Sequence, residues 1–245
     1  MKKTIISLLI LLSSLSFSQQ ENYFDTPFGF GGGFLPMWIV PKVDGLNEQL
    51  KTFGAGELST SGMYASGGAG FAYIMVVPHL RIGGIGVGGI KKESSFNNGY
   101  KREIQYSSSF GGLTIEYTLP FVKSMGISLG AILGGGNTTI ELFRNNNSLA
   151  WNNLWGDISD PSKTTDYFYR KIYSNYFVLA PTLNLDIPVY RFISVRLGLG
   201  HTFTFMDSKD GWKFDNDQDL YNVPESLSNN NLFIQTGIFF GFFSY

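Results

Sequence analysis

The stretch "ISVRLGLGHTFTF", residues 193–205, alternates between two kinds of side chain. One face carries Ile, Val, Leu, Phe and one His, and the other carries Ser, Arg, Gly and Thr. A period of two places successive side chains on opposite faces of a β-strand. A soluble sandwich would present larger polar residues to bulk water on its polar face. Small residues with an occasional charge instead suit a narrow, filled barrel lumen, and the apolar face then meets lipid.

The same alternation recurs along the chain, for example in "GLTIEYTL", "GISLGAIL" and "FVLAPTLNLDI". Seven such strands lie near residues 67–77, 79–91, 100–119, 125–144, 167–187, 191–206 and 231–243. Bacterial membrane barrels have an even number of strands, with both chain ends on the periplasmic side. An eighth strand must therefore precede the first of these, and residues 23–40 are the only candidate. The sequence predicts an all-β fold, a transmembrane antiparallel up-and-down β-barrel of eight strands. Ten strands are the alternative, if the longest segments split or the loops contribute.

The connections between these strands fall into two length classes. The short ones are residues 77–80, 120–124 and 188–190, each with a proline, and the long ones are residues 91–103, 145–166 and 207–230. The long connections are rich in Asn, Asp, Ser and Lys, as solvated loops are. Alternation of short and long connections is typical of a membrane barrel with tight periplasmic turns and longer outer loops.

The beginning of the chain has the layout of a secretory signal peptide. Two lysines precede a short apolar run, and small residues follow, with Ser16 and Ser18 at the −3 and −1 positions of a cleavage site. We therefore expect a signal peptide at residues 1–18 and a single barrel domain at residues 19–245. The sequence contains no uninterrupted apolar run of about 18 residues, the length that a transmembrane helix needs.

Composition supports the same class of protein. The chain has 30 Gly, 22 Phe and 13 Tyr, and only 15% of its residues are charged. Its lack of cysteine removes disulfides, thiolate catalysis and cysteine-ligated metals. Because no basic block exists, nucleic acid is not an expected partner. An exported, aromatic-rich and glycine-rich chain of low charge is expected in the cell outer membrane, with membrane lipid around it.

A short amphipathic helix is predicted at residues 44–53, between the first two strands. Leu46, Leu50 and Phe53 recur at helical spacing, Asp44 is a suitable N-cap, and Gly54 a suitable stop. The helix belongs to a segment, residues 23–66, that combines the first strand with a plug or lid. The pattern leaves three positions open: inside the lumen, across the outer rim, or at the membrane interface.

Four charged residues fall on the inward faces of predicted strands. These residues are Arg81, Glu116, Asp186 and Arg196, and Glu141 joins them if its strand keeps register. Opposite charges in a narrow lumen should pair, because an unpaired buried charge is costly. A salt-bridge network that holds a closed barrel is the favoured interpretation. The alternative is a polar conduit, although an eight-stranded barrel has just enough interior for its own side chains.

No residue pattern in the chain predicts a catalytic, cofactor or metal site. His201 lies on the lipid-facing side of its strand, and no serine stands beside it on that face, so a nucleophile–base pair is not expected. The glycine-rich stretch 81–89 is interpreted as strand glycine, with a bulge near Gly83 and Gly84, and not as a nucleotide motif. The acidic stretch 207–219 lacks the frame of a calcium loop and is interpreted as a solvated loop.

The last strand carries the most specific resemblance. "QTGIFFGF", residues 235–242, is similar to the assembly signal of bacterial outer-membrane barrels, with Gln235, Gly237, Phe240 and Phe242 at its defining positions and Tyr245 as an interface anchor. The chain thus resembles the small bacterial outer-membrane β-barrel proteins, which implies insertion by the barrel-assembly machinery. Even-numbered residues from 232 should face lipid. Phe239 and Phe243 then point inward, so either aromatics fill the lumen or the register slips near Gly241.

Three functional classes remain open at this point. The first is a non-enzymatic barrel that acts through its outer loops or as part of an envelope complex with another protein. The second is a narrow channel or carrier for small or hydrophobic molecules, with the helix as a plug. The third, disfavoured by the position of His201, is a membrane-embedded lipid-modifying enzyme. A fold by itself does not select among them.

Overall fold

The computed structural model describes residues 28–120, 125–146, 167–190, 192–206, 211–224 and 226–244. The predicted signal peptide and the two tryptophans of the predicted 145–166 loop lie outside these residues. Across the described part of the chain, no helix is both long enough and apolar enough to cross a membrane.

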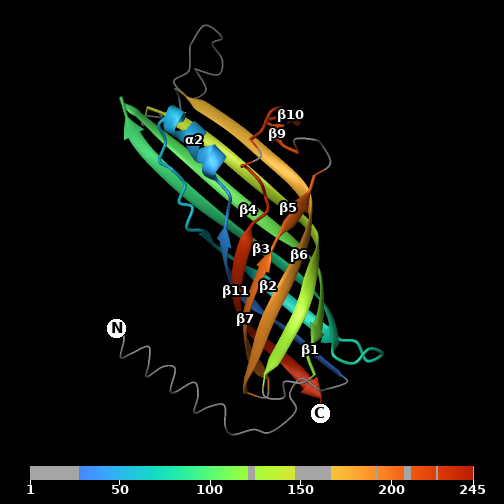
Figure 1. Ribbon diagram of the computed structural model, residues 1–245. Coiled ribbons are helices and arrows are strands. Elements are labelled where there is room, and N and C mark those ends of the chain that lie inside the picture. Colours follow the sequence, from blue (N-terminus) through green and yellow to red (C-terminus); the bar gives the residue numbers. More distant parts are fainter. Residues whose placement is uncertain are drawn as a thin grey trace, which may run out of the picture.

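Eight antiparallel strands close into a ring (Figure 1). The ring consists of β1 (Phe28–Val40), β2 (Met63–Tyr73), β3 (Leu80–Asn97), β4 (Tyr100–Thr118), β5 (Gly126–Asn145), β6 (Phe168–Tyr190), β7 (Ile193–His201) and β11 (Leu232–Ser244). Each strand pairs with its neighbour in sequence, and β11 pairs with both β7 and β1 to close the circle. The prediction of an eight-stranded up-and-down barrel is confirmed.

Three shorter strands lie outside the ring, so the barrel has eight strands and the alternative of ten is wrong. β8 (Phe203–Phe205) follows β7 and pairs with β6, while β9 (Lys213–Phe214) and β10 (Gln218–Asp219) form a small hairpin beside β6. These pieces extend the sheet at one end of the barrel without entering the ring. The long segments do not split.

The two ends of the barrel differ. β1 begins and β11 ends at the end that carries the short connections, which are residues 74–79, 119–125 and 191–192. The opposite end carries the long connections 41–62, 146–167 and 206–231. By the rule for bacterial barrels, the end with the short connections is periplasmic and the other end is outer.

Four strands extend past the ring at the outer end (Figure 1). β3 to β6 have 18 to 23 residues, whereas β1, β2 and β11 have 11 to 13. We call the extension the outer sheet and define it as residues 91–97, 100–106, 140–145 and 168–172, which are paired in register.

The prediction of a long loop at 91–103 is wrong. Asn98 and Gly99, with φ of 52° and 78°, form a two-residue turn between continuous strands.

The helix α2 (Asp44–Phe53) lies across the outer end, over the inner face of the outer sheet (Figure 1). Leu46 and Leu50 are buried in one apolar cluster with residues of the outer sheet such as Ile104 and Ile140. The helix ends at Gly54, whose φ of 75° is left-handed and lets its N–H bond the carbonyl of Leu50. Of the three positions that the sequence left open, the structure has the helix at the outer rim.

The strands present two distinct faces. Apolar and aromatic side chains cover the outside of the ring: Phe30, Phe34, Trp38, Ile82, Leu113, Ile115, Leu129, Leu183, Leu197, Leu199, Ile234, Ile238 and Phe240 are all exposed. The alternate residues are buried in the lumen. Within the ring, each strand pairs with a neighbour on both sides, as a lipid environment demands.

Two predictions of strand register are corrected by the pairing. No bulge occurs near Gly83 and Gly84, because β3 pairs without interruption with both β2 and β4 there. Ile85 points inward, and the alternation is hidden only because the outward positions beside it are glycines. Glu141 faces outward and accepts hydrogen bonds from Gln105 and Tyr169, so it does not join the lumen charges.

The register of the closing strand is also settled. β11 pairs with β1 in one register as far as Ser244, so no slip occurs near Gly241. Phe239 is 1% exposed and points into the lumen. Of the two alternatives for this strand, the structure shows an aromatic side chain filling the interior.

Candidate functional site

The charged cluster in the lumen is assembled by strand register. Arg81 on β3 stands directly opposite Glu116 on β4, and Asp186 on β6 stands directly opposite Arg196 on β7. Cross-strand partners on one face have their Cβ atoms about 5 Å apart, so each pair forms within its own hairpin. The curvature of the ring then brings the two pairs together across the lumen.

The four side chains form a closed square of ion pairs. Arg81 contacts the carboxylates of Glu116 and Asp186 at 2.7 Å each. Arg196 contacts Glu116 at 2.8 Å and Asp186 at 2.7 Å. Each side chain is at most 5% exposed. Two cations and two anions therefore balance within a buried cluster, the arrangement that buried charges require.

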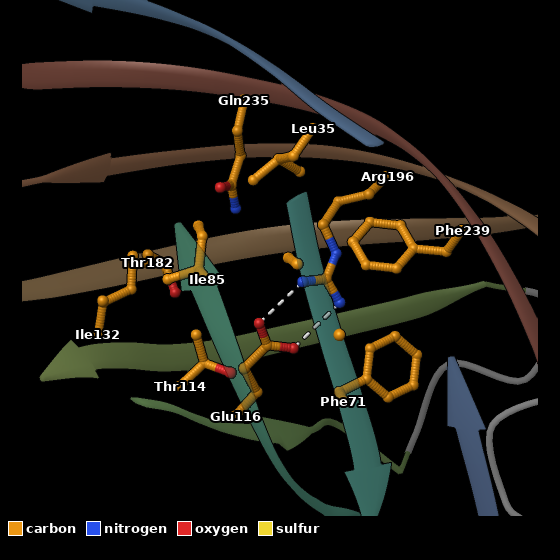
Figure 2. Close-up of a pocket in the computed structure, with 12 residues that line it drawn as sticks. Leu35, Phe71, Ile85, Thr114, Glu116, Ile132, Thr182, Arg196, Gln235 and Phe239 are labelled. Carbon is orange, nitrogen blue, oxygen red and sulfur yellow. Dashed lines mark hydrogen bonds and ion pairs between the residues drawn. The ribbon is translucent and has the colours of Figure 1, made fainter. Parts of the chain in front are cut away.

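Polar and aromatic neighbours complete the cluster. Ser128 accepts a hydrogen bond from Arg81 at 2.8 Å, and Asn184 donates to Glu116 at 3.3 Å. The guanidinium of Arg81 lies 4.8 Å from the centre of the Phe71 ring, and that of Arg196 lies 4.8 Å from the Phe239 ring. Figure 2 shows Phe71 and Phe239 flanking the Glu116–Arg196 ion pair. Such stacking orients a guanidinium while its edges remain free to bond carboxylates.

A glycine makes room for this arrangement. Gly130 on β5 is directly opposite Glu116 in the sheet. A Cβ added there would lie 2.8 Å from the Cγ of Glu116 and 2.9 Å from the carbonyl oxygen of Ile115. A side chain at this position would require Glu116 or the backbone of β4 to shift. The position of this glycine is therefore part of what shapes the charged layer.

The lumen is filled next to the charges. The cavity beside Glu116 and Arg196 has a volume of about 10 Å³, and it is lined by side chains that include Leu35, Phe71 and Phe239 (Figure 2). That is space for roughly one water molecule. Further toward the outer end, the rings of Phe110 and Phe233 lie 5.6 Å apart across the interior. The charged layer and this aromatic pair therefore fill the interior at two levels.

The residues of the predicted assembly signal lie on the closing strand. Gln235 is buried in the lumen and donates a hydrogen bond of 2.5 Å to Asn184. Gly237 also faces inward, where a Cβ would lie 2.9 Å from Leu35. Phe240 faces outward and is 60% exposed, and Phe242 pairs with Phe30 on β1. Tyr245 lies outside the described residues.

The other predicted candidates do not assemble into a reactive site. The His201 ring stands on the outward face 4.7 Å from the Phe203 ring, and its Nδ1 has no hydrogen-bond partner within the described chain. Asp215 accepts a hydrogen bond from the backbone N–H of Lys171, and Asp217 one from the hydroxyl of Tyr173. These two carboxylates tie the acidic stretch to β6, while Asp207 and Asp210 lie outside the described residues. In the ranges that the structure covers, no group of three or more His, Asp or Glu side chains is arranged to hold a metal ion.

Comparisons with known proteins give similarity at the level of solved structures. No family model matches the chain, and no curated protein matches it either. Ail, the attachment invasion locus protein of Yersinia pestis, solved in complex with the heparin analogue sucrose octasulfate, is 11% identical, with a TM-score of 0.41 and 88% of this chain and 97% of that chain covered. A major outer membrane protein from Thermus thermophilus is 9% identical, with a TM-score of 0.48 and coverage of 87% and 99%. The outer membrane protein OprG from Pseudomonas aeruginosa is 13% identical, with a TM-score of 0.42 and coverage of 89% and 96%.

The side-chain pattern of the barrel decides the class of protein. A closed ring of eight strands with an apolar, aromatic outside and a filled inside is built for lipid, because only helices and closed barrels satisfy their backbone groups in a bilayer. The chain has the fold of a membrane-spanning β-barrel, the architecture of the small bacterial outer-membrane proteins. This fold fits the predicted location in the outer membrane.

The outer-membrane barrel also carries functional candidates that sequence reasoning missed. Arg102, Arg144 and Arg170 lie in the outer sheet on three neighbouring strands. They are separated in sequence and fall in or next to segments that were interpreted as loops. Their numbering could have revealed them: inward residues on β4, β5 and β6 are even-numbered, and all three arginines are even-numbered too.

Proposed function

We propose that this outer-membrane barrel is a closed, non-enzymatic protein that acts at the cell surface through its outer sheet and loops, in a structural or interaction role. The observation that carries this proposal is the filled lumen, with four charges locked in mutual ion pairs beside a cavity of about 10 Å³. Because the interior offers no path, the functional surface is outside it. The outer sheet with α2 packed on it is such a surface.

The alternative of a narrow channel or carrier plugged by the helix has less support. The α2 helix lies over the outer rim, whereas the ion pairs and the aromatic layer of Phe110 and Phe233 fill the barrel below it. Removal of the helix would therefore leave the lumen closed.

A lipid-modifying enzyme is disfavoured because a nucleophile, a base and an orienting carboxylate must lie in hydrogen-bond reach, and His201 contacts a phenylalanine ring instead.

The proposed role includes the processing and insertion of the chain. Residues 1–18 serve as a signal peptide, and residues 19–245 form a single barrel domain. The barrel-assembly machinery recognises β11 through Gln235, Gly237 and Phe240, and an envelope protein is the partner of the outer surface. Support for the role of β11 comes from its place at the seam, where it completes the ring by pairing with β1 and β7.

Conductance across planar bilayers tests the proposal. Folded protein is inserted into a bilayer, and insertion is checked by the heat-dependent gel mobility of the same sample. We expect no stable open level from the wild-type chain, and none from the variant Leu46→Asp/Leu50→Asp, which detaches α2. A large stable conductance of the wild type would overturn the closed-barrel proposal. Conductance only in the helix variant would instead establish a plugged channel.

A further inference from the structure

The outer sheet has a charge opposite in sign to that of the whole chain. It contains seven cations, Lys91, Lys92, Lys101, Arg102, Arg144, Arg170 and Lys171, against three carboxylates, Glu93, Glu103 and Glu141. The full chain has a formal charge of −1. The strands that carry these residues project from the outer end of the barrel (Figure 1). A region of one sign attracts ligands of the other.

Two of the arginines are placed against each other. Arg102 on β4 and Arg144 on β5 are direct cross-strand partners, and both share the inward parity of Ile104 and Leu142. Like charges directly opposite on one face destabilise a sheet. Neither guanidinium has a carboxylate within 4.0 Å among the described residues, although each of the four lumen charges has two partners of opposite sign. Within the described residues, this pair has no carboxylate as a counter-charge.

The hydrogen bonds of the pair leave donors unused. Nη1 of Arg102 donates to the carbonyl of Asn97 at 3.2 Å. Nε of Arg144 is buried and has no hydrogen-bond partner within the described part of the chain. Gly54, at the C-terminal end of α2, lies beside the Arg102 side chain. The backbone carbonyls at that end of the helix offset part of the positive charge of Arg102. The buried Nε–H of Arg144 has no comparable acceptor.

Aromatic rings lie against two of the three arginines, Arg144 and Arg170. Phe168 on β6 is the cross-strand partner of Arg144, and its ring lies 5.7 Å from the Arg144 guanidinium and 4.9 Å from that of Arg170. The Tyr100 ring lies 5.6 Å from the Arg144 guanidinium. Arg170 also has Asp215 at 3.9 Å, a long ion pair between partly exposed groups. Stacking fixes the planes of the guanidinium groups and leaves their N–H edges available for a ligand.

We propose that Arg102, Arg144 and Arg170 form a binding site for a phosphate-type oxyanion at the outer tip of the barrel. The planar arginine fork matches the oxygens of phosphate and binds them in pairs. A bound oxyanion supplies a counter-charge that the described residues do not give to the Arg102–Arg144 pair. The phosphate belongs either to a headgroup of an outer-leaflet lipid or to a free phosphate compound. The inference rests on the proposed role of the outer sheet as the interaction surface.

Thermal unfolding of the full chain in detergent tests the site. The probe is inorganic phosphate, compared with chloride at the same ionic strength. We expect phosphate to raise the unfolding midpoint of the wild type by about 3 °C or more once its concentration exceeds Kd roughly tenfold. In the variant R102Q/R144Q, the midpoint in chloride should not fall, because repulsion is relieved, and the phosphate response should vanish. The matched control K92Q removes an outer-sheet cation outside the cluster and should keep the wild-type response.

Two further arms separate the sources and guard against misfolding. Lipopolysaccharide micelles that stabilise the wild type but not R102Q/R144Q assign the site to a lipid headgroup, and a response to inorganic phosphate alone assigns it to a free phosphate. The exposed Arg170 is replaced separately, and R170Q should weaken the phosphate response several-fold even if the double variant fails to fold. Equal midpoints in phosphate and chloride for the wild type would overturn the site, as would an equal loss in K92Q. Bilayer conductance has no bearing on this result, so the two proposals fail independently.

Discussion

Removal of Arg196 from the lumen cluster should destabilise the barrel strongly. Its guanidinium makes four hydrogen bonds of 2.7 to 3.0 Å to Glu116 and Asp186. In Arg196→Met the volume is largely kept, but two buried carboxylates must share Arg81 as their only cation. Loss of one partner from a buried ion pair costs about 3–5 kcal/mol. The unfolding equilibrium should shift by roughly 150- to 5,000-fold, since about 1.4 kcal/mol corresponds to a factor of ten.

Urea titration of the barrel in lipid vesicles measures this change. Unfolding is followed by tryptophan fluorescence and by the loss of the folded band on an unheated gel. Arg196→Lys should fall between the wild type and Arg196→Met, because a single ammonium cannot bridge both carboxylates as a planar fork does. The double variant Arg196→Met/Asp186→Leu removes one charge of each sign, so it should be more stable than Arg196→Met alone.

The outcome can refute the reasoning in two ways. A cost below about 1 kcal/mol for Arg196→Met would mean that water solvates the carboxylates and that the interior is not dry. A double variant no more stable than the single one would mean that the charges are not coupled. Leu197→Met, on the lipid-facing neighbour of Arg196, is the matched control and should leave the free energy of unfolding nearly unchanged.

Three other substitutions test separate parts of the structure. Leu113→Arg, on the lipid face of β4, should lower the free energy of unfolding by about 2–4 kcal/mol near the middle of the bilayer. Ser107→Arg, on the same face nearer the outer sheet, should lower it much less. Equal losses in urea titration would mean that the bilayer is not centred near Leu113. Gly130→Val should cost about 1–3 kcal/mol by overpacking against Glu116, and a stable variant would show that the charged layer adapts. Leu50→Ala should weaken the packing of α2 on the outer sheet by about 2–5 kcal/mol. Hydrogen exchange should then become faster in the outer sheet and stay unchanged in the ring. Faster exchange throughout would mean that the outer sheet and the ring unfold together.

The barrel could be predicted from the sequence because its strands face two contrasting environments. Alternation of Leu197 and Leu199 with Arg196 and Gly198 specifies one lipid face and one lumen face, and the same kind of alternation on β3 and β4 places Arg81 and Glu116 inside. The rule that barrels have an even number of strands then locates the first strand, although that strand has no strong sequence pattern of its own. These inferences need only the period of a strand and the closure of a ring.

The rest depends on information that local pattern does not carry. The polar composition of residues 91–103 is that of a loop, because the outer sheet projects into water on one face, and only the Asn98-Gly99 turn signal marks it as a hairpin. Glycines on the lipid face of β3 removed the alternation and suggested a bulge that is absent. The arginine cluster joins residues from three strands, and its members meet only when the register of β4, β5 and β6 is known.

Topology labelling with single cysteines tests the central claim, a closed barrel in the outer membrane with its outer sheet at the cell surface. The chain has no native cysteine, so each introduced thiol reports one position. Phe96→Cys lies in the outer sheet and Val76→Cys in a short turn, at side chains that are 65% and 87% exposed. A membrane-impermeant maleimide on intact cells should label position 96 fully and position 76 only after the outer membrane is permeabilised. Labelling of position 76 on intact cells, with position 96 protected, would contradict the orientation and the surface role that follows from it.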